Sequence, residues 1–310
     1  MAELDIRELL LEVSEPSRAV AAAESEYEEK IRLLAERVVS SESIRVILLS
    51  GPSGSGKTTT ANLLADRIRA MGEKTLVVSM DNFYRDSADP EYPRLENGER
   101  DYENPYALDI GGLLGVLSSI IDGKPFDIPR YDFKVGGRVG SVSFESFSHG
   151  CVIIEGIHGL NPIFSDPFPR DSVLKVFVSV STNINRGDRR LISGKKLRFI
   201  RRMVRDNIYR GATAEETVNM WANVLMGEEK YLYPYKMTAD VRFDTFHIFE
   251  PCVLKPFADA LLTAELAAEI PYVRTVRDAL SLIPPLPSDI VPESSLIREF
   301  IPGGIYESLY

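Results

Sequence analysis

The chain contains a glycine-rich segment whose residue types and spacing suit the binding of phosphate groups. Residues 51–58 read GPSGSGKT and satisfy the pattern G-x-x-x-x-G-K-[ST]. In such a loop the glycines let backbone N–H groups turn toward phosphate oxygens, and the following helix adds a partial positive charge. The Lys57 side chain can reach the β- and γ-phosphates, and the Thr58 hydroxyl can bind Mg²⁺. We therefore predict a site for ATP or another nucleoside triphosphate with Mg²⁺, formed by Gly51, Ser53, Gly54, Ser55, Gly56, Lys57, Thr58 and Thr59.

Two acidic residues follow apolar runs, so each is expected at the end of a strand. Asp81 comes directly after KTLVVSM (74–80), and Glu155 lies near the end of CVIIEG (151–156). A carboxylate beside a phosphate loop can hold Mg²⁺, or it can accept a proton from an acceptor hydroxyl. Asp81 could equally cap a turn, and Glu155 could face solvent. The residues alone leave these alternatives open.

A basic segment, residues 186–210, stands out against a net charge of −10. Within it Arg198, Arg201 or Arg202, and Arg205 recur at helical spacing, which places three guanidinium groups on one face of a helix. Such a face can be a solvated surface or a patch for nucleic acid. Beside a phosphate loop it can instead belong to a lid, whose arginines stabilise a phosphoryl group in transfer and exclude water.

The elements that must position these residues alternate between strands and helices. Short apolar runs predict strands at 44–50, 74–80, 151–156, 174–180 and 239–244. Helices are predicted at 57–71, 107–122, 186–228 and 249–268. Residues 125–146 alternate around a glycine turn, which indicates a β-hairpin. The order predicts an α/β fold of the P-loop NTPase type, a parallel sheet covered by helices on both faces, with a helical lid and a hairpin on the acceptor side.

The chain divides into three predicted parts. Residues 1–43 read as a helical N-terminal arm, and residues 44–270 as the P-loop domain with its lid at about 183–228. The proline-rich residues 271–310 predict a helix and an extended tail that wraps the domain surface. A polar loop at 87–106 is long enough to be functional or disordered.

Composition excludes several classes of protein. The N-terminus mixes acids with apolar residues, unlike a signal peptide, and no run reaches the roughly 20 apolar residues of a membrane helix. Cys151 and Cys252 provide neither a disulfide framework nor metal-site spacing. We expect a cytoplasmic protein without a membrane partner. The acidic charge argues against nucleic acid as a partner, and a homo-oligomer stays open.

Several motifs, in order, resemble the uridine kinase and phosphoribulokinase family of P-loop kinases. The matching stretches are GPSGSGKTT (51–59), MDNFYRD (80–86), DYENPYALD (101–109), IPRYDFK (128–134), IIEGIHGLNP (153–162), RFIRRMVRDNIYRG (198–211) and ADVRFD (239–244). The resemblance is closest to a bacterial uridine kinase-like branch, in which the tail VPESSLIREFIPGG (291–304) also looks familiar. Many members of that branch carry N-terminal domains related to threonyl-tRNA synthetase, where this chain has the short arm. Together the matches cover about residues 40–304.

The resemblance implies a Mg·ATP-dependent kinase that phosphorylates a hydroxyl of a small molecule. Asp81 occupies the place of the catalytic base and lies near the metal, while Lys57, Thr58 and Glu155 match phosphate- and Mg²⁺-binding positions. The residues that match the lid arginines are Arg198, Arg201, Arg202 and Arg205. We expect Asp81, Lys57 and Arg205 to take part in catalysis.

The resemblance also implies an acceptor site with Glu103, Tyr131 and Phe133, and we expect Tyr84 to belong to it. Lys134 could receive an acidic or phosphorylated acceptor, or it could equally be a solvated charge of the hairpin. Three positions depart from the pattern of nucleoside kinases. Glu103 replaces a sugar-binding aspartate, Gly136 lies where a histidine is expected, and Met220 aligns near a base-reading glutamine. An unpaired buried polar group costs about 1–3 kcal/mol, so these changes bear on the substrate more than on phosphoryl transfer.

Three functions follow as hypotheses. Phosphorylation of uridine or cytidine to the 5′-monophosphate is the first. A kinase for a sugar or sugar phosphate is the second, and an NTP-dependent regulatory or RNA-associated module is the third. His158, in EGIHGLN, is expected to support the site as a loop histidine rather than to act in catalysis.

Overall fold

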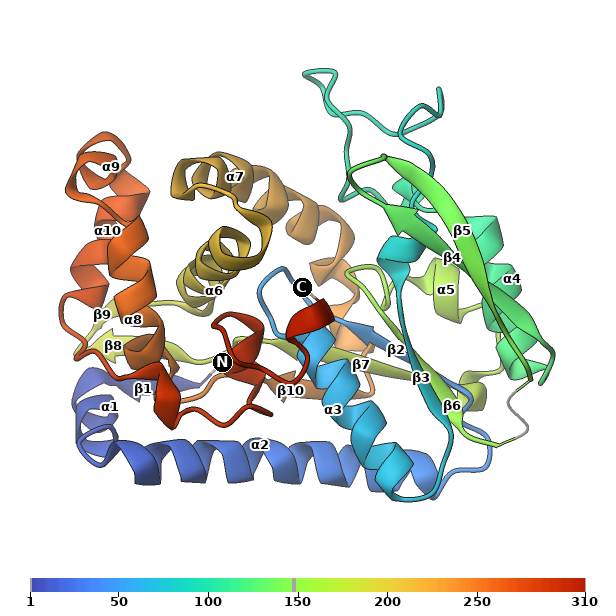
Figure 1. Cartoon of the computed structure of the whole chain (residues 1–310), viewed down its shortest axis with the longest axis horizontal. Helices are drawn as coiled ribbons and strands as arrows, with labels where there is room; N and C mark the ends of the chain where they lie inside the picture. Colours follow the sequence, from blue (N-terminus) through green and yellow to red (C-terminus); the bar gives the residue numbers. More distant parts are fainter. Residues whose placement is uncertain (1, 147–148, 310) are drawn as a thin grey trace.

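A five-stranded parallel sheet forms the centre of the molecule, in the order β10-β7-β2-β6-β3 (Figure 1). The computed structural model describes residues 2–146 and 149–309, so residues 1, 147–148 and 310 of the predicted parts lie outside the described residues. The strands are Val46–Ser50 (β2), Thr75–Ser79 (β3), Cys151–Glu155 (β6), Val173–Ser179 (β7) and Val241–Asp244 (β10). All five strands predicted from the apolar runs, and the parallel sheet, are confirmed.

The strands are apolar on both faces because helices cover both sides of the sheet. In β2, Ile47 and Leu49 belong to one hydrophobic cluster, and Val46 and Leu48 belong to the other. The helices on the first side are Pro16–Val39 (α2), Lys57–Ala70 (α3), Gly194–Arg210 (α6) and Glu250–Leu261 (α8), and the helix on the second side is Ile110–Ile121 (α4). This alternation explains why each strand reads as a continuous apolar run.

The N-terminal arm differs from the prediction at its beginning. Before α2 the chain forms a strand, Glu3–Asp5 (β1), and a short helix, Ile6–Glu12 (α1). β1 pairs in parallel with Asn183–Arg186 (β8), which forms an antiparallel hairpin with Arg189–Ile192 (β9). The prediction of helix from residue 186 is therefore wrong as far as Ile192. The hairpin is stabilised by a partner about 180 residues away in sequence, which local pattern does not reveal.

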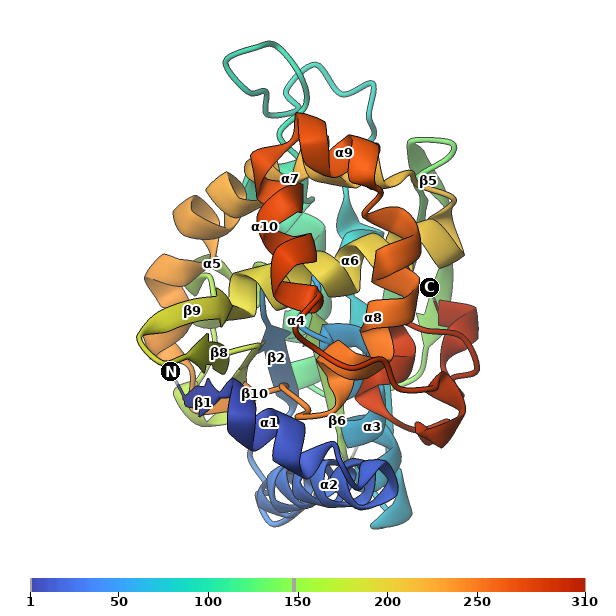
Figure 2. The ribbon, with the colours of Figure 1, turned by 90° about the vertical axis from the view of Figure 1, so that its left-hand side faces the viewer.

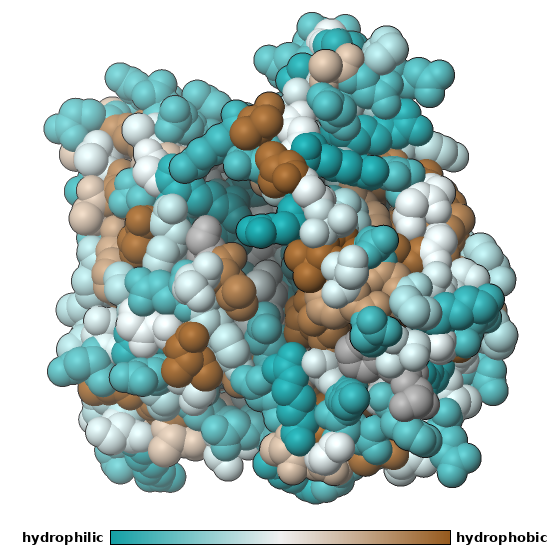
Figure 3. Space-filling view, turned by 45° about the vertical axis from the view of Figure 1, so that its right-hand side comes forward, coloured by the Kyte–Doolittle hydropathy of each residue, from teal (hydrophilic) through white to brown (hydrophobic). Residues whose placement is uncertain are grey.

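The acceptor-side hairpin is confirmed as Phe126–Asp132 (β4) and Gly137–Phe144 (β5). It lies over α4, on the side of the sheet opposite the N-terminal arm (Figure 1). The remaining helices are Pro162–Ser165 (α5), Ala214–Tyr231 (α7), Ala264–Glu269 (α9) and Pro271–Leu280 (α10). Figure 2 shows α9 and α10 beside α6 and α8, on the side of the molecule away from the hairpin. A space-filling view shows a deep hollow in the upper part of the molecule, bordered by both hydrophilic and hydrophobic side chains (Figure 3).

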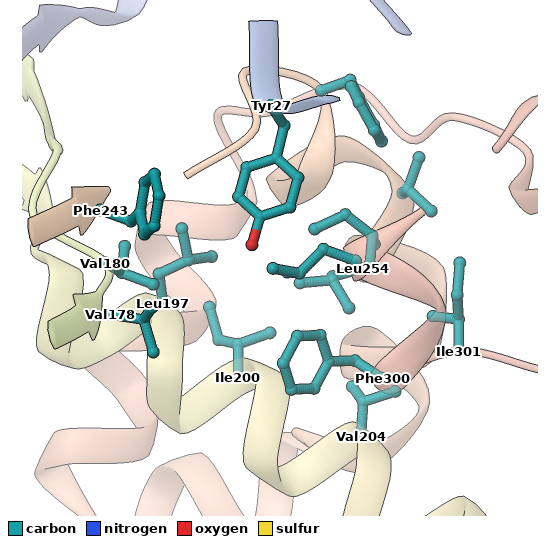
Figure 4. Packing of buried hydrophobic residues seen from close by; sticks show 14 of the residues in the cluster. Tyr27, Val178, Val180, Leu197, Ile200, Val204, Phe243, Leu254, Phe300 and Ile301 are labelled. Atoms are coloured by element: carbon teal, nitrogen blue, oxygen red, sulfur yellow. The ribbon is translucent and has the colours of Figure 1, made fainter. Parts of the chain in front are cut away.

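The C-terminal tail is part of the hydrophobic core, which corrects the expectation that it only wraps the surface. Leu296, Ile297, Phe300 and Ile301 are fully buried. Figure 4 shows Phe300 and Ile301 packed among Tyr27 of α2, Ile200 and Val204 of α6, and Leu254 of α8. Full burial of a large apolar side chain contributes roughly 1.5–3 kcal/mol, so four of them fix the tail firmly in place.

Within the described residues, no helix combines the length and apolar character needed to cross a membrane.

Candidate active site

The glycine-rich loop connects the carboxyl end of β2 to the first turn of α3, as its sequence predicts. A side chain at Gly51 would lie 2.1 Å from the carbonyl oxygen of Val178 in the neighbouring strand, so only glycine fits there. Gly56 has a φ of +85°, in the left-handed region that glycine favours, and it directly precedes the helix. The amino end of α3 therefore lies at the edge of the sheet where β2 ends.

Strand register brings the two predicted acids beside this loop. Glu155 ends β6 and pairs with Leu49 of β2 on one side and with Ser79 of β3 on the other. Asp81 follows β3 in a short 3₁₀ turn, in which its N–H donates to the Ser79 hydroxyl. Because parallel strands end at the same edge of a sheet, both acids face the loop. One cavity of about 190 Å³ is lined by Lys57, Thr58, Asp81 and Glu155, together with other residues.

Both carboxyl groups have raised pKa values. Burial raises the pKa of Glu155 to about 7, the Asp81 charge adds to the rise, and Lys57 opposes it. The Asp81 side chain is open to the cavity, so water reduces the effect of the surrounding protein on its pKa. Its pKa is still raised, with desolvation as the main cause and Lys57, Arg210 and Arg205 in opposition. A cation between the two acids would relieve their mutual repulsion.

The residues present fit a Mg²⁺ ion that is shared with a nucleotide. The described residues contain no group of three or more acidic, histidine or cysteine side chains that could form an all-protein cage. Mg²⁺ usually binds one or two carboxylates and completes its shell with water and substrate phosphates. Glu155, the Thr58 hydroxyl and Asp81 line the same cavity and supply such a donor set.

Asp206 forms ion pairs with the arginines that line the cavity. Both Nε and Nη2 of Arg205 donate to one Asp206 oxygen, at 2.9 and 2.8 Å, and Nε of Arg202 lies 3.2 Å from the other oxygen. Arg210, which the motif comparison did not single out, lies 3.4 Å from Asp206 and also lines the cavity. Arg202 donates to the Ser53 hydroxyl of the loop at 2.8 Å. The site thus has three arginines held by one carboxylate.

The other two predicted lid arginines lie elsewhere. Arg198 is paired with Glu228, and Arg201 with Glu250, in ion pairs that are almost fully buried. Both arginines also donate to loop carbonyls, Arg198 to that of Ser53 at 2.8 Å and Arg201 to that of Gly54 at 3.2 Å. The structure does not bring Arg198 and Arg201 to the cavity; it places them behind the loop.

An aromatic group forms the acceptor side. The Tyr84 ring lies 5.7 Å from Tyr131 and 5.5 Å from Phe133, centroid to centroid, and Tyr84 itself lines the cavity. Glu103 lines the cavity too, and burial raises its pKa to about 7, against the charge of Arg202. Lys134 is exposed and does not line the cavity. Four of the five predicted acceptor residues are therefore close to Asp81 or in contact with Tyr84.

His158 lines the same cavity and, within the part of the chain that the structure describes, is buried without hydrogen-bond partners for its ring. It is 3% exposed, and neither ring nitrogen has a hydrogen-bond partner among the described residues. Burial lowers its pKa to about 3, so the imidazole is neutral at physiological pH. A neutral imidazole has one donor and one acceptor nitrogen, and here both are buried without a hydrogen-bond partner among the described residues.

Sequence reasoning missed two charged residues that line the cavity, Arg210 and Glu299. The helical spacing of the basic segment could have indicated Arg210, which lies one further turn beyond Arg205 and Asp206. Glu299 comes from the tail, 240 residues beyond its hydrogen-bond partner Thr59. No local sequence pattern indicates that Glu299 contacts Thr59.

Comparisons with known proteins identify the family that this chain resembles. The family model described as the phosphoribulokinase / uridine kinase family matches residues 46–248. A uridine kinase of Staphylococcus epidermidis is 29% identical over 199 residues, which cover 63% of this chain and 85% of that protein. A uridine kinase of Deinococcus deserti is 30% identical over 198 residues, with the same coverage. Among solved structures, a possible uridine kinase from Bacillus stearothermophilus has a TM-score of 0.48 and 19% identity, over 71% of this chain and 100% of that one.

Proposed function

Since this chain belongs to the phosphoribulokinase / uridine kinase family, and is thereby an ATP-dependent kinase acting on a hydroxyl group, we propose that its acceptor is a nucleoside. The 5′-hydroxyl of uridine or cytidine is the first candidate. Support comes from the relatives named uridine kinase, each matched over 85% of its length. The aromatic rings of Tyr84, Tyr131 and Phe133 offer a nucleobase surfaces on which to stack.

One observation carries the proposed chemistry: Asp81 shares a cavity with Lys57, Thr58 and Glu155. We assign to Asp81 the role of orienting the acceptor hydroxyl and taking its proton. Its raised pKa suits a base, because a more basic carboxylate accepts a proton more readily. Lys57 and the loop N–H groups would hold the donor phosphates, and Arg202, Arg205 and Arg210 would stabilise charge on the transferred group.

The metal would be held by Glu155 and the Thr58 hydroxyl, with Asp81 close by. When bound, Mg²⁺ supplies charge neutralisation at the β- and γ-phosphates. Arg202 and Arg205 lie on α6, and the cavity between them and Lys57 would exclude water once it is filled. Exclusion of water directs the phosphoryl group to the acceptor hydroxyl rather than to hydrolysis.

A second candidate acceptor is a sugar phosphate, and a neighbouring cavity supports it. This cavity, about 580 Å³ in volume, meets the first at Glu103 and Arg202. Arg94 and Arg100 also line it, and the buried Nε of Arg100 has no hydrogen-bond partner among the described residues. The acids Glu99 and Asp101 line the same cavity, and their charges would repel the phosphate group of a sugar phosphate. The nucleoside is therefore the favoured acceptor.

The test is release of ADP from Mg·ATP by the purified chain across a panel of nucleosides, sugars and sugar phosphates. We expect release that depends on uridine or cytidine. Release driven only by a sugar phosphate would favour the second candidate. If no acceptor raises ADP release above background while RNA binds tightly at physiological salt, the kinase proposal is replaced by that of an RNA-associated module.

A further inference from the structure

The tail places a carboxylate on the phosphate-binding end of α3. One oxygen of Glu299 accepts hydrogen bonds from both the backbone N–H and the hydroxyl of Thr59, at 3.2 and 3.0 Å. Thr59 is the third residue of α3, within the first turn, whose N–H groups in a P-loop bind the α- and β-phosphates of a nucleotide. The side chain of Glu299 is 4% exposed and also lies 3.7 Å from Arg205. A protein anion thus occupies donors that a nucleotide phosphate needs.

The segment that carries Glu299 is fixed against the loop. A side chain added at Gly56 would lie 2.8 Å from Leu296, so the tail packs directly on the backbone of the loop. Phe300 faces the guanidinium of Arg201 at 4.9 Å, and Arg201 in turn donates to the Gly54 carbonyl. Four fully buried apolar side chains anchor the segment, as described above. Departure of the whole tail when a ligand binds would expose all of them, whereas rotation of the Glu299 side chain exposes none.

On the premise of the proposed kinase function, we propose that Glu299 is a specificity-determining residue of the donor site, a built-in competitor for the phosphate that binds at Thr59. When a nucleotide binds, its phosphate replaces the carboxylate at Thr59. Glu299 then turns toward Arg205, which is already within reach, while the tail backbone stays in place.

A purely structural role would be that of a helix cap. Gly56, the N-cap residue of α3, has no side chain to bond the first turn, and Glu299 supplies an acceptor from a distance. A cap and a competitor differ in one respect. Loss of a cap changes stability and leaves the affinity for nucleotide unchanged, whereas loss of a competitor increases that affinity.

The size of the ligand separates the two roles further. Pyrophosphate can occupy the cradle near Lys57, which serves the β- and γ-phosphates, without reaching Thr59. A nucleoside triphosphate must place its α-phosphate farther along the first turn of α3. Removal of the Glu299 charge should therefore favour the nucleotide and leave pyrophosphate binding unaltered.

The experiment measures binding of a non-hydrolysable ATP analogue and of pyrophosphate, each with Mg²⁺, by calorimetry. The variants are Glu299→Gln, which keeps the shape, and Glu299→Asp, which keeps the charge but shortens the reach to Thr59. Glu293→Gln, an exposed acid of the same tail, is the control. We expect the analogue to bind Glu299→Gln about tenfold more tightly than the wild type, the low end for hydrogen bonds to a charged group. Pyrophosphate affinity, and both affinities of Glu293→Gln, should stay within twofold.

Hydrogen exchange of residues 295–301 provides a second measurement that does not depend on a variant. Protection of these amides should not fall when the analogue binds, because the tail stays docked and bound ligand only adds to the stability of the folded state. The inference is overturned if Glu299→Gln binds the analogue no more tightly than the wild type does, or if pyrophosphate affinity rises equally. If neither the wild type nor any variant binds the analogue at all, the kinase proposal itself fails, which is a separate result.

Discussion

Arg198 and Glu228 form a two-pronged ion pair beneath the glycine-rich loop, with N···O distances of 2.7 and 2.8 Å. The side chains are 2% and 1% exposed. Glu228 also accepts a hydrogen bond from the Ser53 N–H at 2.9 Å, and Arg198 donates to the Ser53 carbonyl. The pair therefore connects α6 and α7 to the N–H and the carbonyl of one loop residue. We infer that the role of this ion pair is to fix the conformation of the loop.

Removal of one partner of this pair should destabilise the protein strongly. We predict that Arg198→Met lowers the free energy of unfolding by about 3–5 kcal/mol, because Glu228 is then left charged and buried without its partner. The matched control is Lys195→Met, which breaks the exposed pair between Lys195 and Glu229 one turn away and should cost at most about 1 kcal/mol. Urea unfolding measures both. Equal stability of the two variants would contradict the structural role.

Gly227 provides a way to disturb Glu103 without changing its chemistry. A side chain at Gly227 of α7 would lie 2.4 Å from the Cβ atom of Glu103. The added methyl group can be accommodated only if Glu103 moves. Gly227→Ala should therefore raise the KM for the acceptor roughly tenfold, which corresponds to a loss of about 1.4 kcal/mol of acceptor binding. The KM for ATP should change little.

The control for this prediction is Gly115→Ala in α4, where the added methyl group meets no atom within 4 Å. Steady-state kinetics with each substrate varied in turn measures both variants. An unchanged acceptor KM in Gly227→Ala would show that Glu103 is not part of the acceptor site.

Glu24 should make stability depend on pH. Burial raises its pKa to about 7, and the nearby Glu28 charge adds to this, against a hydrogen bond from Ser295. The neighbouring His247 does not compensate, since burial lowers its pKa to about 3 and leaves it neutral. Between pH 4.5 and 7 the folded state holds a proton on Glu24 that the unfolded state has released. This contribution to stability is complete below pH 4.5 and is lost as the pH rises through 7.

The wild type should therefore lose about 2 kcal/mol of stability relative to Glu24→Gln between pH 5 and pH 8. The comparison uses urea unfolding of both proteins at the two pH values. A constant difference between them would show that Glu24 has the same pKa in the folded and unfolded states.

Local sequence pattern was sufficient for the sheet and for the loop. The five strands are short and largely apolar runs, which is the pattern expected of a parallel sheet buried on both faces. Asp81 and Glu155 could be placed beside Lys57 because parallel strands end at a common edge. The assignment of roles to these residues came from the family resemblance, and it stays a proposal.

Contacts between distant residues were not predictable in the same way. Helical spacing puts Arg198, Arg201 and Arg205 on one face, but it does not reveal which carboxylate each will meet. Glu228 and Glu250 lie 30 and 49 residues farther along and draw Arg198 and Arg201 behind the loop. Pairing of β1 with β8 and docking of Glu299 on Thr59 likewise depend on tertiary packing across most of the chain.

The central claim is that Asp81 takes the proton from the acceptor hydroxyl, and Asp81→Asn tests it most directly. The measurement is the single-turnover rate of γ-phosphate transfer from Mg·ATP to the acceptor that the panel identifies, with nucleotide affinity determined on the same samples. We predict a rate about 10²–10⁴-fold lower, with nucleotide affinity within a fewfold of the wild type, because a positioned base contributes that much to the transition state. Transfer at the wild-type rate in Asp81→Asn would contradict the account.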